Sequence, residues 1–495
     1  MEFKYPGGDI TTVLDLASRD IQDDHIFPLK SNISWFTRRD TRTHPYTPTI
    51  QSFSYKGRAG FGQTITFEIP PSAGDLLHFL ALQIRPEHWF PSSIIEAFNT
   101  GTNKYDKSYK AYTWANSLGT ILIERAEFKV GDTVLETVNS TWADISFKLF
   151  GSVNSQVGIS VDSIGAVQFG DPTNRFNPNN MYPIENGTWL CPLPFWFNRN
   201  RMDAAFPIAS CRENTIRITL TFRPFHEVIR CVGGSRQSCT ETPLGKSWLL
   251  TNGTTVNAKQ NIGDFQDLQI ITYTSFIDEQ LRQQRYIQRP FEFLFRQCQT
   301  FHISEPMKYA VSGNSTTDKV NIIVPLECNG PIEEIIWVIR RKGVAINNDW
   351  TNYAPAVESQ IIPSITRNST ADREFPELLD RAIVQVNGLP VIDMNGNWFR
   401  RHIAEKHSGG FVSYKSYIYG YSFADKPGTY QPSGSANMSR GQDLRLNLSI
   451  YNPFPVSLGP GFSDDLSNGW EVFVHCVGIN WVRFEYGICN PVFSS

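Results

Sequence analysis

The sequence lacks the features that mark several large classes of protein. No segment approaches the roughly 20 consecutive apolar residues that a membrane-spanning helix needs, so we expect no transmembrane helix. With 45 basic and 48 acidic residues the net charge is −3, which provides no general surplus of positive charge for binding nucleic acid. The eight cysteines include no Cys-x-x-Cys spacing, so we predict neither a zinc site nor a disulfide framework.

Motifs for targeting and for catalysis are missing as well. The opening residues, MEFKYPGGDITTVLDL, have no basic segment followed by an apolar stretch, so we expect a soluble protein made in a reducing cytosol and not a secreted one. No Gly-x-Ser-x-Gly, His-Glu-x-x-His, P-loop or Rossmann fingerprint occurs. We therefore predict no catalytic residue, no cofactor-binding residue and no metal ligand, and we do not expect an enzyme.

Two segments nevertheless invite a chemical interpretation. His402 and His407 bracket Glu405, but a spacing of five residues places the two rings on different faces of a helix or strand, which argues against a metal pair. The stretch CPLPFWFNRNR (Cys191–Arg201) could form an aromatic platform for a sugar, although an apolar strand leading into an interface is the commoner structure. Paired carboxylates of the glycosidase type leave no local signature. A β-sandwich carbohydrate-binding protein or glycosidase therefore remains an alternative hypothesis.

Aromatic residues, glycine and proline are abundant. Aromatic side chains make up 13% of the chain, beside 35 Gly and 30 Pro. Flat and branched side chains suit a pleated surface, while Gly and Pro suit its many reversals, so the composition favours β structure. A length of 495 residues predicts two or three domains.

An internal duplication organises the chain. Residues 65–82 and residues 320–338 both read as a strand, a turn and an apolar strand, with Gly74 and Gly330 in the turns, 256 positions apart. The hairpins Arg125–Trp142 and Arg381–Trp398 repeat Arg, Ala, Val, Asn and Trp at the same offset. Two further pairs of strands follow, 215–224 with 443–453 and 267–278 with 470–487. We predict two tandem all-β domains of the sandwich or barrel class.

Two connecting segments stand out. Between the copies, Asp278 can cap a helix that Pro290 ends, so we predict a short linker helix over 279–290. The second segment, Tyr417–Ile450, places a run of Pro, Gly, Ser and Asn between two strands. We interpret its Pro432 and Gly434 as structural, at a barrel end or domain junction, where they interrupt what would otherwise be one long ladder.

The motifs also resemble those of a known family, the major capsid proteins of nucleocytoplasmic large double-stranded DNA viruses, such as the iridoviruses and the algal and amoebal giant viruses. The similarity spans roughly residues 20–490 and rests on several motifs in the family's order. These are PLKSNISWFTRRDTRTHPYT, FGQTITFEIPPSAGDLLHFLALQIRP, IERAEFKVGDTVLETVNSTWADI, PLPFWFNRNRMDAAFPIASCRENTIRITLTFRP, GPIEEIIWVIRR, YSFADKPGTYQPSGSANMSR and FVHCVGINWVRFEYG.

The resemblance implies an all-β double jelly roll, with two eight-stranded antiparallel barrels, long loop insertions and the short linker helix. The implied domains are an N-terminal arm at 1–25, a first jelly roll at 26–278, the linker helix at 279–290 and a second jelly roll at 291–495. The duplicated turn and strand positions are then structural: Gly74, Gly330, Arg125, Arg381, Trp142 and Trp398, together with Pro432 and Gly434.

The resemblance also implies a function. Such proteins form homotrimeric, pseudo-hexagonal capsomers that tile the icosahedral shell of a virion assembled in the host cytoplasm. Expected partners are other copies of the chain, neighbouring capsomers, minor capsid proteins and an internal membrane, without sequence-specific binding of nucleic acid and without a cofactor. An alternative with the same fold is a capsid-like scaffold on an immature viral membrane.

Overall fold

The computed structural model describes most of the strands and the helices near them. The described residues are 45–86, 111–114, 118–150, 189–198, 204–232, 247–249, 255–257, 265–305, 319–341, 348, 350, 351, 353, 379–408, 417–429, 431–439, 444–451 and 470–492. All elements named below belong to the unit Tyr46–Ser495. The predicted N-terminal arm, residues 1–25, lies outside the described residues.

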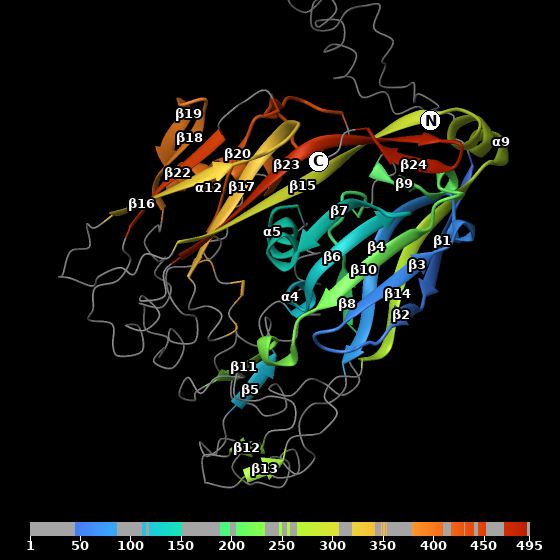
Figure 1. Ribbon diagram of the computed structural model, residues 1–495, viewed down its shortest axis with the longest axis horizontal. Helices are drawn as coiled ribbons and strands as arrows, with labels where there is room; N and C mark the ends of the chain where they lie inside the picture. Colours follow the sequence, from blue (N-terminus) through green and yellow to red (C-terminus); the bar gives the residue numbers. More distant parts are fainter. Residues whose placement is uncertain are drawn as a thin grey trace, which may run out of the picture. The chain divides into compact units, whose positions relative to one another are not determined.

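Two sheets form the first barrel (Figure 1). One has the order β1-β14-β4-β8, with β9 also paired to β4; the other has the order β2-β3-β10-β6-β7. The bounds are β1 Tyr46–Phe53, β14 Phe265–Ile277, β4 Leu76–Pro86, β8 Trp189–Pro192, β9 Phe206–Pro207, β2 Tyr55–Gly57, β3 Thr64–Ile69, β10 Ile216–Phe222, β6 Ile123–Val130 and β7 Thr133–Asn139. Two small hairpins pair β5 (Ala111–Trp114) with β11 (Ile229–Val232) and β12 (Ser247–Leu249) with β13 (Thr255–Asn257).

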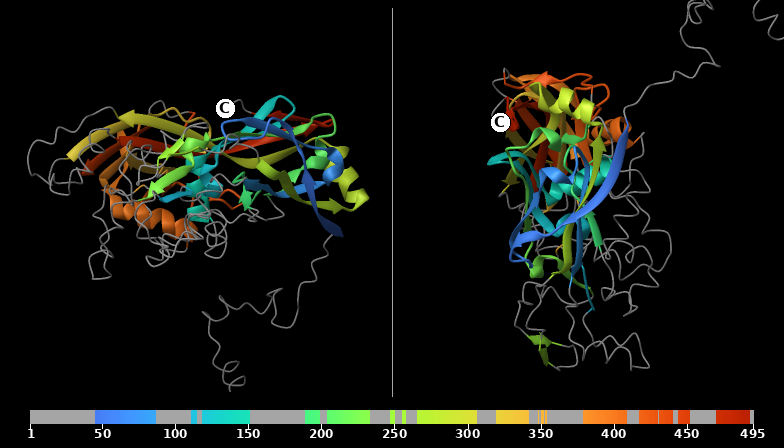
Figure 2. Two further views of the ribbon diagram at one scale, coloured as in Figure 1. Left: turned by 90° about the horizontal axis from the view of Figure 1, so that it is seen from below. Right: turned by 90° about the vertical axis from the view of Figure 1, so that its right-hand side faces the viewer.

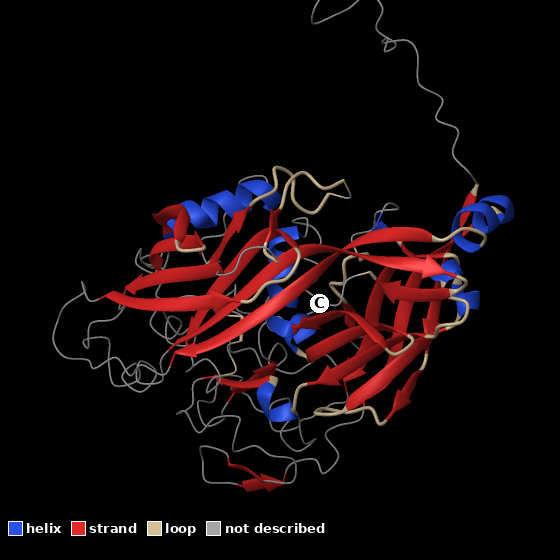
Figure 3. Ribbon diagram, turned by 45° about the horizontal axis from the view of Figure 1, so that its top comes forward, coloured by secondary structure: helices blue, strands red, loops and turns tan. Residues whose placement is uncertain are grey.

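Two more sheets form the second barrel. One has the order β15-β23-β17-β20, with β21 also paired to β17 and β24 to β23; the other has the order β16-β22-β18-β19. The bounds are β15 Phe291–Glu305, β23 Trp470–Glu485, β17 Pro331–Arg341, β20 Ile418–Ser422, β21 Ala436–Asn437, β24 Ile488–Pro491, β16 Lys319–Leu326, β22 Leu444–Tyr451, β18 Leu379–Val386 and β19 Leu389–Asn395. Every pairing in both barrels is antiparallel. Strands dominate the described part of the chain (Figure 3), and the all-β prediction is confirmed.

The two barrels share one strand order. Reading along the chain, β1, β3, β4, β6, β7, β8, β10 and β14 hold the places in the first barrel that β15, β16, β17, β18, β19, β20, β22 and β23 hold in the second. All four repeated sequence pairs fall on matching strands, so the duplication read from the sequence is a duplication of structure. Both sets of strands can be followed from blue to red in the turned views (Figure 2).

The repeated hairpins match residue by residue. Arg125 lies opposite Asn139 in the first, and Arg381 lies opposite Asn395 in the second. The register shifts between Phe128 and Lys129 in one and at the equivalent step, Val384 to Gln385, in the other. Because the irregularity occurs at the same step in both copies, it is a shared structural feature of the duplicated hairpin and not a local defect.

Each hairpin is followed by a helix that the sequence analysis did not predict. Helix α5 (Ser140–Phe150) follows β7, and α12 (Gly396–Ser408) follows β19. The side-chain oxygen of Asn139 accepts a hydrogen bond from the backbone N–H of Trp142 at 2.7 Å, and Asn395 accepts one from Trp398 at 2.9 Å. The repeated Asn is therefore a helix N-cap, and the repeated Trp occupies the first turn.

The predicted linker helix is present. The Asp278 carboxylate accepts hydrogen bonds from the backbone N–H groups of Gln280 and Leu281, at 3.1 and 3.4 Å. An α-turn, α9 (Glu279–Leu281), continues into the π-helical segment η6 (Arg282–Ile287) and ends before Pro290, after which β15 begins. The remaining short helices are α4 (Leu118–Ile121), η1 (Pro71–Ala73), η3 (Ile208–Ser210) and η4 (Phe225–Glu227).

Alternating side chains build the core. Every second residue of β10, from Ile216 to Phe222, is buried, as expected for a strand with one face toward a core. In contrast, β17 and most of β23 are buried on both faces. One face of this central sheet lines its own barrel, so the other face must be covered from outside.

Candidate functional site: the inter-barrel seam and the Pro-Gly crossover

The described residues contain no cluster of three or more His, Cys, Asp or Glu side chains that could hold a metal ion. Both histidines considered above lie on α12. The ring of His402 stacks on Trp398, with centroids 4.7 Å apart, whereas His407 Nε2 lies 2.6 Å from Glu334 Oε1. The two rings therefore contact different residues, although Glu334 and His407 both influence the pKa of His402 electrostatically, and the prediction that they form no metal pair stays a prediction. No helix in the described part of the chain is long and apolar enough to cross a bilayer.

Aromatic side chains form the apolar half of the seam, the surface where the two barrels meet. Trp196 of the first barrel packs on Phe295 of the second at 4.7 Å between centroids, and Phe206 packs on Phe484 at 5.9 Å. Trp196 also contacts Phe128 in its own barrel at 5.4 Å. The aromatic stretch after Cys191 is thus part of an interface, as the commoner interpretation held, and its arginines lie outside the described residues.

A polar cluster lies farther along the same seam. Tyr353 Oη donates a hydrogen bond to Asp144 Oδ2 at 2.9 Å, and Lys148 Nζ lies 2.6 Å from the same oxygen. Burial raises the pKa of Tyr353 well above its usual range, and the negative charge of Asp144 raises it further. The phenol therefore stays protonated and acts as a donor, which joins a helix of the first barrel to a segment of the second.

The repeated tryptophans have different surroundings. Trp142, on α5, is 5% exposed and packs across the seam on His475 of β23, with ring centroids 5.2 Å apart. Burial lowers the pKa of His475 to about 3, so the imidazole is neutral at physiological pH. Its Nδ1 lies 3.0 Å from Thr300 Oγ1, while Nε2 has no partner among the described residues. The equivalent residue of the second barrel, Trp398, is only half-buried.

The repeated arginines lie at the surface. Arg125 pairs with Glu127, and Arg381 pairs with Asp393; the arginine side chains are 58% and 57% exposed. Exposed pairs of this kind contribute little to stability, because solvent screens the charges and the long side chains lose entropy. The arginine is thus repeated at the surface of both hairpins, but its acidic partner lies on the same strand in the first hairpin and on the neighbouring strand in the second.

The repeated glycines occupy turns with positive φ. At Gly74, φ is +154°, and a Cβ atom would lie 2.7 Å from the Cβ of Thr274 on the neighbouring strand. At Gly330, φ is +81°, and the backbone N–H donates to Ser439 Oγ at 2.8 Å. Both turns favour glycine because of their positive φ. Only at Gly74 would a larger residue also clash with a neighbouring strand.

The Pro-Gly segment, residues 423–443, is a crossover between two sheets. The segment does interrupt a ladder, because β20 pairs with Glu334–Val338 of β17 and β21, on the far side of the turns, pairs with Pro331 and Ile332 of the same strand. The ladder does not continue into β22, however, because β22 belongs to the β16-β22-β18-β19 sheet. The chain must leave one layer of the barrel and enter the other, which requires a change of direction that a regular strand cannot make. Its location at a barrel end or a domain junction stays a prediction.

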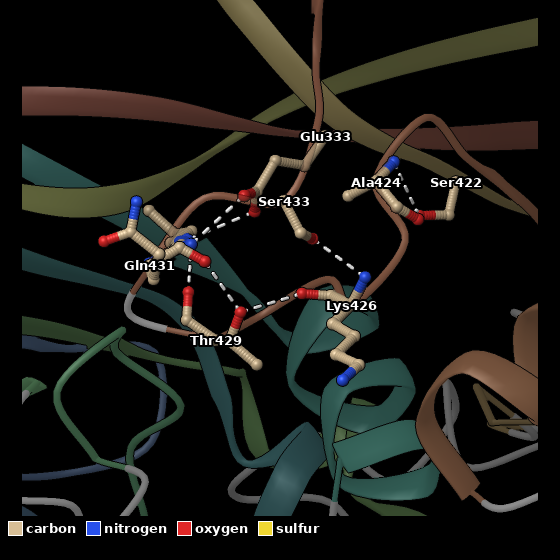
Figure 4. Close-up of polar contacts among 8 residues, drawn as sticks. Glu333, Ser422, Ala424, Lys426, Thr429, Gln431 and Ser433 are labelled. Atoms are coloured by element: carbon tan, nitrogen blue, oxygen red, sulfur yellow. Dashed lines mark hydrogen bonds and ion pairs between the residues drawn. The ribbon is translucent and has the colours of Figure 1, made fainter. Parts of the chain in front are cut away.

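Short-range hydrogen bonds hold the described part of this crossover (Figure 4). Lys426 N–H donates to Ser433 Oγ at 2.8 Å, and the Thr429 hydroxyl lies within 2.9 Å of the Lys426 carbonyl and 2.8 Å of the Gln431 carbonyl. At Gly434, φ is +145°, and a Cβ atom would lie 2.8 Å from the Phe423 carbonyl oxygen. Gly434 thus lets the two arms of the loop approach each other.

A buried ion pair anchors the crossover to the barrel. Arg296 on β15 and Glu333 on β17 form two hydrogen bonds of 3.1 Å, with side chains 8% and 0% exposed. The Arg296 Nη2 also donates to the carbonyl of Thr429. The sequence analysis missed this pair. The pair could have been suspected because a charged residue stands in each of two otherwise apolar strands, Arg296 in FEFLFRQC and Glu333 in PIEEIIWV.

Comparisons with known proteins agree with this architecture. Residues 34–269 match the family described as major capsid protein N-terminus, and residues 283–489 match the family described as large eukaryotic DNA virus major capsid protein. The first match ends before the linker helix, and the second begins within it, at residue 283.

Individual relatives are distant. The major capsid protein of Chrysochromulina ericina virus is 23% identical over 317 residues, which covers 58% of this chain and 50% of that protein. The major capsid protein of Pyramimonas orientalis virus is 22% identical over 402 residues, covering 80% of this chain and 81% of that protein. The chain thus spans about half the length of the first relative and most of the second.

Among solved structures, a subunit of the PBCV-1 virus capsid has the same fold, with a TM-score of 0.65 at 16% identity over 93% of this chain and all of that one. Two family matches that together span both barrels, a shared double jelly roll and capsid relatives lead to one conclusion. The chain belongs to the major capsid protein family of large eukaryotic DNA viruses.

Proposed function

We propose that the chain is a shell-forming subunit and that three copies assemble into a pseudo-hexagonal capsomer. The observation that carries the proposal is the pair of barrels with one strand order, packed together along a buried seam. A trimer of such chains presents six similar barrels, so that a threefold assembly can fit a sixfold environment in a shell. Closed homo-oligomers of this kind are the usual outcome when a repeated surface meets a complementary one.

The seam suits this role. A capsomer must keep its two barrels together while forces act on the shell, and a buried surface of aromatic rings and satisfied polar groups supplies that cohesion. The relatives, which are capsid proteins, support a role without catalysis. The proposed partners are neighbouring capsomers, minor capsid proteins and an internal membrane, in a virion assembled in the host cytoplasm.

The native mass of the purified chain tests the proposal. Light scattering coupled to size exclusion should show a species near three times the 56.2 kDa of one chain. Electron microscopy of the concentrated species should then show hexagonal arrays. A monomer at micromolar concentration would refute the trimer. A species that coats membranes but is missing from mature particles would instead favour the scaffold alternative.

A further inference from the structure

Matching edges of the two barrels differ sharply in exposure. On β7 of the first barrel, Leu135 and Val138 are 2% and 3% exposed. Their equivalents 256 residues later on β19, Val391 and Met394, are 46% and 44% exposed, and the neighbouring Leu389 is 72% exposed. Because the two hairpins share one register and one bulge, the difference arises from what lies against each edge from outside.

The first edge is covered by the same chain. Strand β7 contacts β15 of the second barrel, and Gln297 Nε2 on β15 donates to the carbonyl of Leu135 at 3.4 Å. Trp196, whose backbone N–H donates to Glu136 on β7, fills the space up to Phe295 of β15. By contrast, β19 ends its sheet, and within the described residues no further barrel lies against it.

Strand β1, which is the equivalent in the first barrel of the covering strand β15, also has an exposed outer face. By strand order, β15 corresponds to β1, the edge strand of the first barrel. Ile50 on β1 is 70% exposed and lies opposite Tyr273 of β14, which in turn lies opposite Phe79 of β4. Residues directly opposite in antiparallel strands point to the same face. The outer face at β1 is therefore an apolar surface of the same general kind as β19.

We propose that β19 of one copy docks on the outer face of β1 in a second copy, and so repeats between chains the contact that β7 makes with β15 within each chain. The inference rests on the proposed trimer and names the surfaces that build it. The contact is heterologous, since each copy offers a β19 edge to one neighbour and a β1 face to the other, and a ring results if the rotation closes. The exposed residues of α12, Asn397, Arg401 and Glu405, are polar and suit the rim of this interface.

Single charges test the two surfaces separately. Val391→Asp and Ile50→Asp should each convert the trimer to smaller species at micromolar concentration, because a carboxylate in an apolar contact loses its hydration without a partner. Ile323→Asp is the matched control, since Ile323 is 61% exposed on β16, at the opposite edge of the same sheet as β19. Sedimentation velocity gives the oligomeric state, and circular dichroism confirms that each variant is folded.

Mixing distinguishes this arrangement from others. Equal amounts of Val391→Asp and Ile50→Asp should form a dimer, because one intact β19 edge meets one intact β1 face. A symmetric contact between like surfaces would give no such complementation. For a variant that fails to fold, Val391→Cys combined with Ile50→Cys and a short bis-maleimide should yield covalent oligomers, whereas Val391→Cys with Ile323→Cys should not.

The two proposals fail differently. If the native chain is a trimer and the Val391→Asp and Ile50→Asp variants remain trimers like the control, the trimer stands and this docking surface is wrong. If the native chain is a monomer, the trimer itself is refuted, and this inference is refuted with it.

Discussion

The buried pair of Arg296 and Glu333 provides the most demanding test of how the second barrel is held together. Arg296→Met leaves a carboxylate that is 0% exposed without its counter-charge and the carbonyl of Thr429 without its donor. Removing one partner of a buried pair costs about 3–5 kcal/mol, because the remaining charge is desolvated and unpaired. For a unit of about 200 residues this corresponds to a fall in Tm of roughly 10 °C.

The assay is differential scanning calorimetry at one fixed protein concentration, since association also shifts Tm. The double variant Arg296→Met/Glu333→Met should recover most of the loss, because methionines of similar volume remove both charges from the interior. Arg381→Met, which breaks an exposed pair of the same chemistry, is the matched control and should leave Tm unchanged. A second readout is limited proteolysis, in which Arg296→Met should speed cleavage within residues 425–439.

Two results would refute the reasoning. If Arg296→Met were as harmless as Arg381→Met, the ion pair would not anchor the crossover. If the double variant were as unstable as the single one, the cost would come from lost packing and not from an unpaired charge.

Three further outcomes follow from single residues. Gly74→Ala should lower Tm clearly more than Gly330→Ala, because only at Gly74 would the new Cβ meet another strand, at 2.7 Å; equal shifts would contradict this. Burial lowers the pKa of His475 to about 3, so protonation favours the unfolded chain. The contribution of His475 to stability should be full above about pH 6.5 and fall by about 1.4 kcal/mol per unit below it, down to about pH 3. His475→Gln should therefore make Tm fall less steeply than in the native chain between pH 7 and 4, and equal slopes would contradict this. Gly434→Val should reduce the yield of folded trimer and Pro432→Ala should reduce it less; unchanged yields for both would show that this turn is not structural.

More of the fold than of the candidate site could be predicted from the sequence. The offset of 256 positions, read from Gly74 and Gly330, was enough to pair strands that occupy matching places in the two barrels. It succeeded because a tight turn needs positive φ wherever it occurs, so the residue persists while its surroundings change. Helices α5 and α12 were missed because the hairpin pattern was extended into their first turns, although Asn139 and Asn395 could have marked their N-caps.

The seam and the crossover could not be read in the same way. The contacts of Trp142 with His475 and of Arg296 with Glu333 join residues that are far apart in the chain, and no local periodicity encodes such a pairing. The crossover was recognised as rich in turns, but a turn looks the same whether it continues one sheet or leads into another. Only the pairing of β20 with β17 and of β22 with β16 and β18 decides between them.

The position of β23 has a consequence for the order of events during synthesis. This strand runs between β15 and β17 and pairs with both along most of its length, yet it comes almost last in the chain. Until it emerges from the ribosome, both of its neighbours carry unpaired backbone groups that invite association with other chains. The equivalent strand of the first barrel, β14, is also the last of its barrel, but it is complete by Ile277, before the strands of the second barrel have been made. We therefore expect the first barrel to fold while the second is still being translated, and chains interrupted before Trp470 to aggregate and so to be kept out of the shell.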